Sequence, residues 1–424
     1  MGTKLKISYH RAVIYLMALF TVVGCFGYIG SIYIYRTTVK YMAIVLLYSI
    51  FVLYMYRRKS KKIPLIWFVL WIYIIISTLF LNFPNSIRYL IVFTLGILLI
   101  KLCCIAEDFF TNMIKFFSIA GCFFSFGTVI QAFAPSIFNI VLRIIQSDYL
   151  YEQTQSYWVR FNAYCGFAGE SSFNAFCISL GILCLISQAF AERKLGIFRL
   201  ILILISYYAI FLTGKRSFLL LIPMIIFFVF LFFAIAEKRK KYIIIFIILL
   251  ILTPLVFYSF LGDIVLNILA SGKGSESTSF IDLSNREVFW GIAIGMLKSK
   301  PLFGHGLMSY DNFYNSYFNN THTFAGAHNS YFQLLGEMGI VGGLLFFTAI
   351  IKSFLIGIID MWKIIGHRQT EIKIRMISFY SICIQAMCIL YGFSGNTFHR
   401  PQQLFTYFVA IAMGLYVHKR IGLR

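Results

Sequence analysis

Apolar residues recur along the chain in blocks of about 20, separated by short polar stretches. A helix needs about 20 apolar residues to cross a bilayer, so the pattern predicts an all-α polytopic membrane protein. The first apolar run is too long for a signal peptide and is interpreted as the first span. We expect about twelve transmembrane helices, at residues 12–35, 39–56, 63–82, 86–105, 109–133, 171–190, 195–213, 217–236, 243–261, 334–358, 375–393 and 402–418.

Lysines and arginines are divided unequally between the two sets of predicted loops. With the N-terminus inside, 25 of the 37 fall in inward segments such as "RRKSKK" (57–62) and "EKRKK" (237–241). Because basic loops stay on the cytoplasmic side, both termini are predicted to be cytoplasmic. The chain (1–424) is then a single transmembrane domain with two long outward-facing loops, 134–170 and 262–333. Short helices are expected in these loops, and the second has one predicted near 285–298.

Composition agrees with a membrane location. Of the 424 residues, 60% are hydrophobic and 12% are charged, about half the charge of a typical soluble protein. The net charge of +22 would suggest nucleic acid in a soluble protein, but here most cations follow the topology rule, and no nucleic-acid partner is expected. The nine cysteines show neither metal-type nor disulfide-type spacing.

Twelve cations remain on the outward side, where topology disfavours them, and some are expected to bind a ligand. Lys215 and Arg216 lie in the turn "FLTGKRSFLL" and could clamp a phosphate, or could simply be interfacial cations. Arg286 lies in the first turn of a predicted helix, where its charge opposes the helix dipole. It either snorkels to lipid headgroups or binds an anion.

Arg160 and Glu170 lie in "VRFNAYCGFAGESSFNAF", just before the sixth predicted span. Glu170 could cap that helix, as could the two serines that follow it. Alternatively, Glu170 pairs with Arg160 or contacts a sugar hydroxyl. These interpretations stay open.

The stretch "AHNSYFQLLGEMGIVGGLLFF" (327–347) places polar groups at the start of the tenth span. Asn329 or Ser330 can cap the helix, which leaves His328 at its N-terminus. The helix dipole lowers the pKa of an imidazole there, so His328 is suited to act as a general base near neutral pH. The alternative is a histidine without a chemical role.

Within the same stretch, three glycines fall at helical spacing on one face and predict close packing against a neighbouring helix: Gly336, Gly339 and Gly343. Glu337 lies about 10 Å along the helix, where an ionised carboxylate requires a partner or water.

The outward histidines are His305, His322, His328 and His399. No two share a helical face and no cysteine accompanies them, so no metal site and no cofactor are expected. Acid pairs of the DxD type are also absent from the outer loops, so cations must neutralise any phosphate.

The order of four motifs resembles the O-antigen ligase and polymerase superfamily. These are "RFNAYCGFAGESSFNAF", "LTGKRSFLLL", "NREVFWGIAIGMLKSKPLFGHG" and "AHNSYFQLLGEMGIVGGLLFF", which together span about the C-terminal two thirds of the chain. The resemblance implies metal-independent transfer of an oligosaccharide from undecaprenyl pyrophosphate to an acceptor hydroxyl on the outer face of the bacterial cytoplasmic membrane. By motif, Arg216 and Arg286 would hold the pyrophosphate, and His328 would deprotonate the acceptor or orient the leaving group. Arg160 would be a further charged contact. The family commonly has Ser-Arg where this chain has Lys215 and Arg216, so Lys215 is expected to be an added clamp rather than a matched residue. Glu170 and Asn329 are further candidate substrate contacts.

"GESSFNAF" is more similar to the polymerase pattern of the family than to the ligase pattern, although its proline is missing. A repeat-unit polymerase for O-antigen, capsular or exopolysaccharide is therefore preferred over a ligase that uses lipid A core. A transporter of the same lipid-linked sugar is the third alternative. Expected partners are the undecaprenyl-pyrophosphate-linked oligosaccharide and the lipid bilayer, with a polysaccharide chain-length regulator as a further candidate.

Overall fold

The computed structural model describes residues 2–26, 63–83, 85–102, 107–145, 148–161, 163–236, 283–319, 326–366 and 370–422. These ranges contain helices and no strand, which confirms the all-α prediction. The α-helices are α1 (Gly2–Cys25), α3 (Leu65–Phe80), α4 (Ile87–Leu102), α5 (Glu107–Phe133), α6 (Pro135–Ile145), α7 (Asp148–Phe161), α8 (Ser171–Glu192), α9 (Ile197–Leu212), α10 (Arg216–Ala236), α12 (Leu283–Ser299), α13 (Tyr310–Tyr317), α14 (Ser330–Gly366), α15 (Ile372–Tyr391) and α16 (Pro401–Gly422), and a 3-10 helix, η2, covers Gly166–Ala168.

Five helices within these ranges are long and apolar enough to cross a bilayer, namely Asp108–Phe133, Ser171–Glu192, Arg216–Ile235, Ser330–Gly366 and Ile372–Tyr391. The expected total of about twelve spans is not confirmed. Ten of the twelve predicted ranges overlap a described helix, and several of these helices are too short or too polar to qualify. The predicted spans 39–56 and 243–261 lie outside the described residues.

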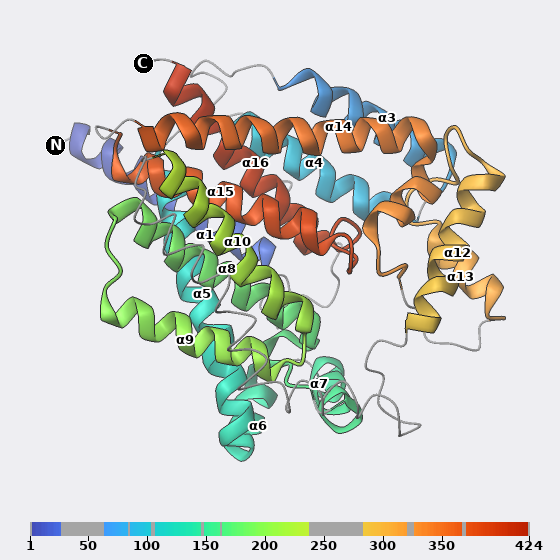
Figure 1. Cartoon of the computed structure of the whole chain (residues 1–424), viewed down its shortest axis with the longest axis horizontal. Coiled ribbons are helices and arrows are strands. Elements are labelled where there is room, and N and C mark those ends of the chain that lie inside the picture. The colour runs from blue at the N-terminus through green and yellow to red at the C-terminus, as the bar shows by residue number, and fades with distance from the viewer. Residues whose placement is uncertain are drawn as a thin grey trace.

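Helices α8, α15 and α16 form the centre of the bundle (Figure 1). Every residue of α8 from Ser171 to Ser187 is buried, as expected of a helix that is apolar on all sides. Helix α5 crosses α8 at Gly121 and Gly181, where a Cβ added to Gly121 would lie 2.3 Å from the Cα of Gly181. Small residues at this crossing therefore allow the two backbones to touch.

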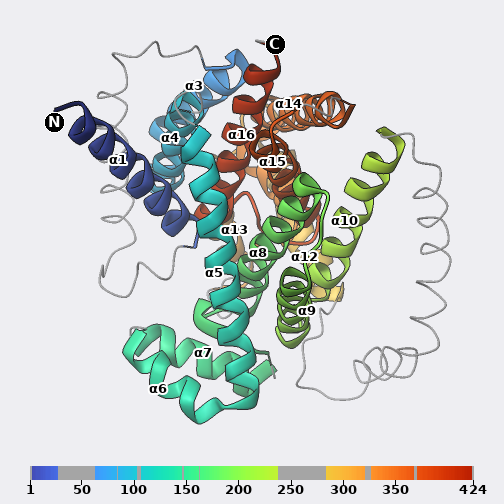
Figure 2. The same cartoon turned by 90° about the vertical axis from the view of Figure 1, so that its left-hand side faces the viewer.

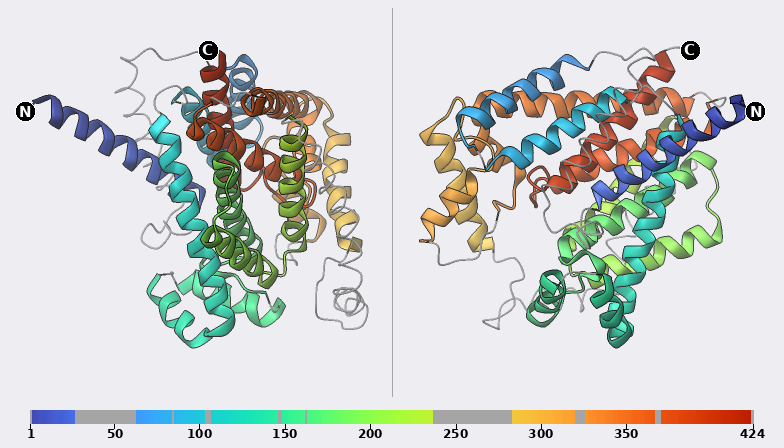
Figure 3. Two further views of the ribbon diagram at one scale, coloured as in Figure 1. Left: turned by 60° about the vertical axis from the view of Figure 1, so that its left-hand side comes forward. Right: turned by 180° about the vertical axis from the view of Figure 1, so that it is seen from behind.

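Both chain termini lie at one end of the bundle, and α12 and α13 lie at the opposite end beside the start of α14 (Figure 1). Figures 2 and 3 show α6 and α7 as an outlying pair at the end of α5. These two regions fall in the predicted long loops 134–170 and 262–333. Helix α12 confirms the helix predicted near 285–298.

Helix α14 is interrupted at Gly339, whose φ of 64° and ψ of −172° belong to a region that only glycine adopts readily. The break frees the N–H groups of Ile340 and Val341, which donate to the carbonyls of Pro301 and Leu302 at 2.8 and 3.1 Å. A Cβ on Gly339 would lie 2.4 Å from the Leu302 carbonyl oxygen. The segment after α12 is thus docked into the break.

The interpretation of the three α14 glycines as one continuous helical face is therefore wrong at Gly339. Gly336 does pack closely, because its added Cβ would lie 2.7 Å from the Ala293 carbonyl oxygen of α12. Gly343 instead faces side chains of α14 itself, the nearest being Leu335. Sequence spacing alone does not distinguish these three environments.

Candidate functional site

Five charged or titratable residues occupy helix starts at the end of the bundle that holds α12. Glu170 precedes α8, Lys215 precedes α10, Arg286 lies in the first turn of α12, His328 precedes α14 and Arg400 precedes α16. The charges of the other four all influence the pKa of the His328 imidazole, so the structure brings them together. Helix N-termini carry partial positive charge, and with three cations they make this end of the bundle suited to anions.

His328 and Asn329 form the entry to α14. Asn329 Oδ1 accepts the N–H groups of Tyr331 and Phe332 at 3.0 and 3.2 Å, which confirms that Asn329 can cap this helix. The predicted contact of Asn329 with substrate stays a prediction. The half-buried His328 ring lies 6.1 Å from the ring of Phe289 in α12.

The pKa of His328 is lowered from its ordinary value of 6.5 to about 4. Burial is the largest cause, and the positive charges of Arg286, Arg400 and Lys215 act in the same direction, while Glu170 partly opposes them. At neutral pH His328 is therefore a neutral imidazole that can accept a proton. A negatively charged ligand among these cations would raise its pKa.

Glu170 makes a bidentate ion pair with Arg400, with N···O distances of 2.6 and 2.7 Å. The Ser172 hydroxyl also donates to the Glu170 carboxylate. Burial alone would raise the pKa of Glu170, but the guanidinium of Arg400 outweighs it and the pKa falls to about 2. Glu170 occupies the N-cap position of α8, yet its side chain makes no cap hydrogen bond. The helix cap expected of Glu170 is therefore not formed by its side chain. Glu170 does form an ion pair, but its observed partner is Arg400.

Lys215 and Arg216 lie at the turn from α9 to α10, which is made by Gly214 with a φ of 68°. Burial lowers the pKa of Lys215, the carboxylate of Glu170 opposes this effect, and Arg400 and Arg286 add to it. Lys215 therefore shares the electrostatic environment of His328. Arg216 begins α10 directly beside it.

Arg160 lies in the last turn of α7, and its side chain is outside the described residues.

The turn 392–400, between α15 and α16, packs against the start of α14. The Ser330 N–H donates to the carbonyls of Gly392 and Gly395 at 2.8 and 3.1 Å, and its hydroxyl donates to Gly395 at 3.0 Å. The His328 N–H donates to Asn396 Oδ1 at 2.9 Å. One short turn thus supplies Arg400 and also holds the segment that carries His328.

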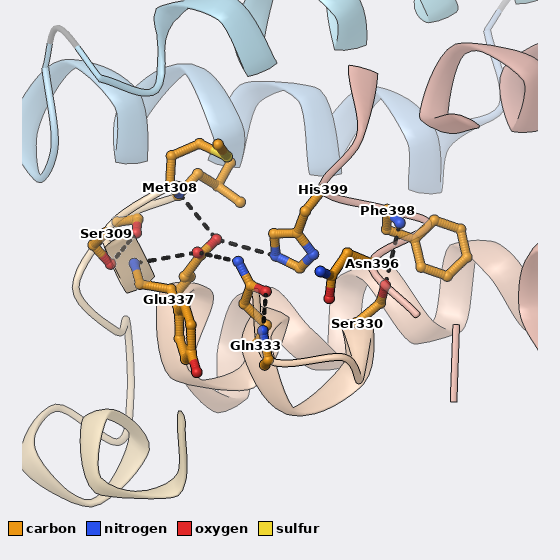
Figure 4. A network of polar contacts seen from close by, with 12 residues as sticks. Met308, Ser309, Ser330, Gln333, Glu337, Asn396, Phe398 and His399 are labelled. Atoms are coloured by element: carbon orange, nitrogen blue, oxygen red, sulfur yellow. Dashed lines mark hydrogen bonds and ion pairs between the residues drawn. The ribbon is translucent and has the colours of Figure 1, made fainter. Parts of the chain in front are cut away.

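Next to this turn, the fully buried carboxylate of Glu337 is the centre of a polar network (Figure 4). Glu337 Oε2 accepts the Met308 N–H at 3.0 Å and lies 3.3 Å from His399 Nε2. Its Oε1 accepts from the Gln333 amide at 3.0 Å and from the Tyr310 N–H at 3.4 Å. The carboxylate has the partners that its position along α14 requires, and it fastens α14 to the segment before α13.

The sequence analysis does not single out three residues of this site, namely Arg400, Asn396 and Tyr391. Arg400 is one of the twelve outward cations, and the same topological argument that selects Arg286 applies to it. Asn396 carries no sequence signal, because an asparagine in a turn is common. Tyr391 also lies close enough for its electrostatics to couple with Arg286 and Arg400.

Among the residues that the structure describes, no three His, Cys, Asp or Glu side chains form a group that could hold a metal ion. His322 lies outside the described residues. His305 lies apart at the end of α12, where its Nε2 is 2.7 Å from the Ser299 hydroxyl. The chemistry that the described arrangement offers is anion binding by cations and helix starts beside a neutral imidazole.

Comparison with known families supports the motif-based resemblance. Residues 200–347 match the sequence model of the O-antigen ligase family. The match covers 148 of the 424 residues and supports the resemblance of this part of the chain to the O-antigen ligase and polymerase superfamily. The superfamily match includes Lys215, Arg216, Arg286 and His328, whereas Glu170 and Arg400 lie outside it. Enzymes of this superfamily are membrane glycosyltransferases of the ligase or polymerase type that act on lipid-linked oligosaccharides. A comparison with curated proteins gives no match.

Proposed function

We propose that the protein polymerises undecaprenyl-pyrophosphate-linked oligosaccharide repeat units at the outer face of the bacterial cytoplasmic membrane. The observation that carries the proposal is the group of Lys215, Arg286 and Arg400 around a neutral His328. Pyrophosphate is the charged part of such a donor, and this site offers cations and helix starts to hold it. The orientation, with both termini in the cytoplasm, is part of the proposal, and so is the inner-membrane location.

In the proposed reaction, the anomeric carbon of the donor sugar leaves the pyrophosphate oxygen and forms a bond to the acceptor hydroxyl oxygen. His328 takes the proton of that hydroxyl, and the leaving pyrophosphate departs with the electron pair of the broken bond. Arg286 and Arg216 would hold the pyrophosphate, with Lys215 as an added point charge. Fixed cations around the leaving oxygen stabilise negative charge as it develops, which is the largest contribution that many such sites make.

Donor binding also activates the base in this scheme. In the free protein, cations keep the pKa of His328 at about 4, which makes it a weak base. The negative charges of a bound pyrophosphate would compensate those cations and raise the pKa toward the range where general bases are effective. The acceptor hydroxyl would therefore be deprotonated only when a donor is in place.

A ligase that transfers the finished glycan to lipid A core is the second candidate, and the description of the matched family favours it. The two activities differ in the acceptor alone. Reconstitution in liposomes with lipid-linked repeat units, with and without lipid A core, separates them. A product ladder from donor alone supports the polymerase, product that requires lipid A core supports the ligase, and no transfer in either case favours transport of the lipid-linked sugar.

The variant His328→Ala tests the role of the base. It should insert normally and lose transfer, because His328 is the proposed base and lies among the charges of Arg286 and Lys215. Asn329, Glu170 and Arg160 are proposed as substrate contacts, and their substitution should change acceptor or donor KM more than kcat. Normal product yield and length from His328→Ala would contradict the proposed mechanism.

A further inference from the structure

His328 holds a backbone conformation that residues with side chains rarely adopt. Its φ is 52°, in the left-handed region, which costs a non-glycine residue about 1 kcal/mol or more. Such a conformation persists where surrounding contacts hold it. The backbone N–H of His328 donates a hydrogen bond to Asn396 Oδ1, at 2.9 Å.

Asn396 is itself held from two sides. Gly326 packs against its amide so closely that an added Cβ would lie 2.2 Å from Asn396 Nδ2. On the other side, the Asn396 backbone carbonyl accepts the N–H groups of His399 and Arg400, both at 3.1 Å. The side chain of Asn396 therefore contacts the segment of His328, while its main chain forms the turn that carries Arg400.

We propose that Asn396 is a positioning residue that fixes the His328 imidazole relative to the Arg400 guanidinium. The inference rests on the proposed function, because it concerns the geometry of the same base. A general base must lie within hydrogen-bond reach of the proton that it removes, and a displacement of about 1 Å can lower a rate by about 100-fold. Asn396 would set the distance between the His328 imidazole and the acceptor hydroxyl, because it holds the backbone N–H of His328.

The test uses the full-length protein in proteoliposomes, with lipid-linked oligosaccharide extracted from cells that lack the protein as the donor. Asn396→Ala removes the acceptor oxygen and is expected to lower kcat by about 10- to 100-fold, with the donor KM unchanged. Asn396→Asp retains the oxygen and should recover most of the rate. A role limited to folding would not produce this separation of kcat from KM or this recovery.

Two variants provide the controls. Ser394→Ala removes a hydroxyl of the same turn that donates to the Tyr391 carbonyl at the end of α15, at 3.5 Å, and it should keep the wild-type kcat. Gly326→Ala displaces the Asn396 amide without removing any polar group, and it should lower kcat as Asn396→Ala does. The affinity of each variant for undecaprenyl pyrophosphate, measured in detergent, shows whether the anion site formed by Lys215, Arg286 and Arg400 is intact.

Wild-type kcat in Asn396→Ala, or a raised donor KM in place of a lowered kcat, would overturn the proposal. If Asn396→Ala fails to bind undecaprenyl pyrophosphate, its kcat is not informative and the test passes to Gly326→Ala. A wild-type kcat in Gly326→Ala would then overturn the proposal. His328→Ala is measured in parallel. Full activity of His328→Ala means that the proposed base is wrong, whereas its inactivity beside a fully active Asn396→Ala means that only the positioning role is wrong.

Discussion

The carboxylate of Glu170 and the guanidinium of Arg400, 230 residues apart in the chain, face each other through two hydrogen bonds of 2.6 and 2.7 Å. The pair joins the start of α8 to the start of α16 at the candidate site. Arg400 is one of the cations that lower the pKa of His328, and Glu170 is the carboxylate that opposes them. A single ion pair therefore contributes to both the architecture and the electrostatics of this end of the bundle.

Glu170→Gln should lower stability at neutral pH by about 2 kcal/mol, because it replaces charged hydrogen bonds to Arg400 with neutral ones. The pKa of Glu170 falls from 4.5 to about 2 on folding, so its contribution is fully present above pH 4.5 and is lost as the pH falls toward 2. The melting temperatures of wild type and variant should therefore converge below pH 4.5. Glu192→Gln is the matched control, since Glu192 pairs with Arg199 at the exposed opposite end of α8. A constant difference between Glu170→Gln and wild type at all pH values would exclude this role.

The pH dependence of transfer should report the environment of His328. The base must be neutral, so activity is lost as the pH falls through its pKa. In the pH profile of kcat/KM, the loss of activity on the acidic side, the acidic limb, should be centred near pH 4, which is the pKa of His328 in the free protein. In kcat it should lie higher, because a bound pyrophosphate raises the pKa.

Arg286→Ala removes one of the cations that lower the pKa of His328, so it should move the acidic limb of kcat/KM upward. Lys298→Ala, at the exposed far end of α12, should leave the limb in place. The relevant charges around the imidazole are those of Arg286, Arg400, Lys215 and Glu170. An identical limb in wild type and Arg286→Ala would show that His328 is not the titrating base.

Donor affinity should depend on the cations at the helix starts. Arg216→Ala, Arg286→Ala and Lys215→Ala are each expected to weaken binding of undecaprenyl pyrophosphate by about 10- to 100-fold, the range for one charge-assisted hydrogen bond. Arg286→Lys should recover only part of the loss, because an ammonium cannot make a bidentate contact. Binding can be measured in detergent with Lys298→Ala as the matched control. Wild-type affinity in all three alanine variants would contradict the pyrophosphate site.

Two glycine-to-alanine substitutions separate a helix break from an ordinary helical position. Gly295→Ala in α12 meets nothing within 4 Å and should be neutral or stabilising by up to about 1 kcal/mol. Gly339→Ala should destabilise by several times that amount, because alanine is disfavoured at a φ of 64° and its Cβ would contact the Leu302 carbonyl. Melting temperatures in detergent provide the comparison. Equal stability of the two variants would mean that α14 is continuous through Gly339.

Local features of the site could be predicted from the sequence. The cap at Asn329, the helix that begins near Arg286 and the partner required by Glu337 all follow from spacing of a few residues or from the cost of a buried charge. The gathering of Lys215, Arg286 and His328 was predicted through the family resemblance and through their position on the disfavoured side of the membrane.

Features that depend on which helices are neighbours could not be predicted in this way. Glu170 meets Arg400 because α8 and α16 lie together in the bundle, and no pattern near either residue indicates this. The break at Gly339 depends on carbonyls from the segment 301–302, which is distant in sequence. Regular glycine spacing indicated a continuous helix there, because spacing does not report backbone dihedral angles.

The order of synthesis gives the Glu170–Arg400 pair a further consequence. At a translation rate of about 5–20 residues per second, Arg400 leaves the ribosome roughly 10 to 50 s after Glu170. Lys215, Arg286 and His328 are added in turn during that interval, and by its end the chain contains all three but lacks both the counterpart of Glu170 and the turn that holds His328. Before α16 joins the bundle, a partly synthesised chain therefore has these cations without the Glu170–Arg400 pair, and under the proposed mechanism it could not yet process a donor.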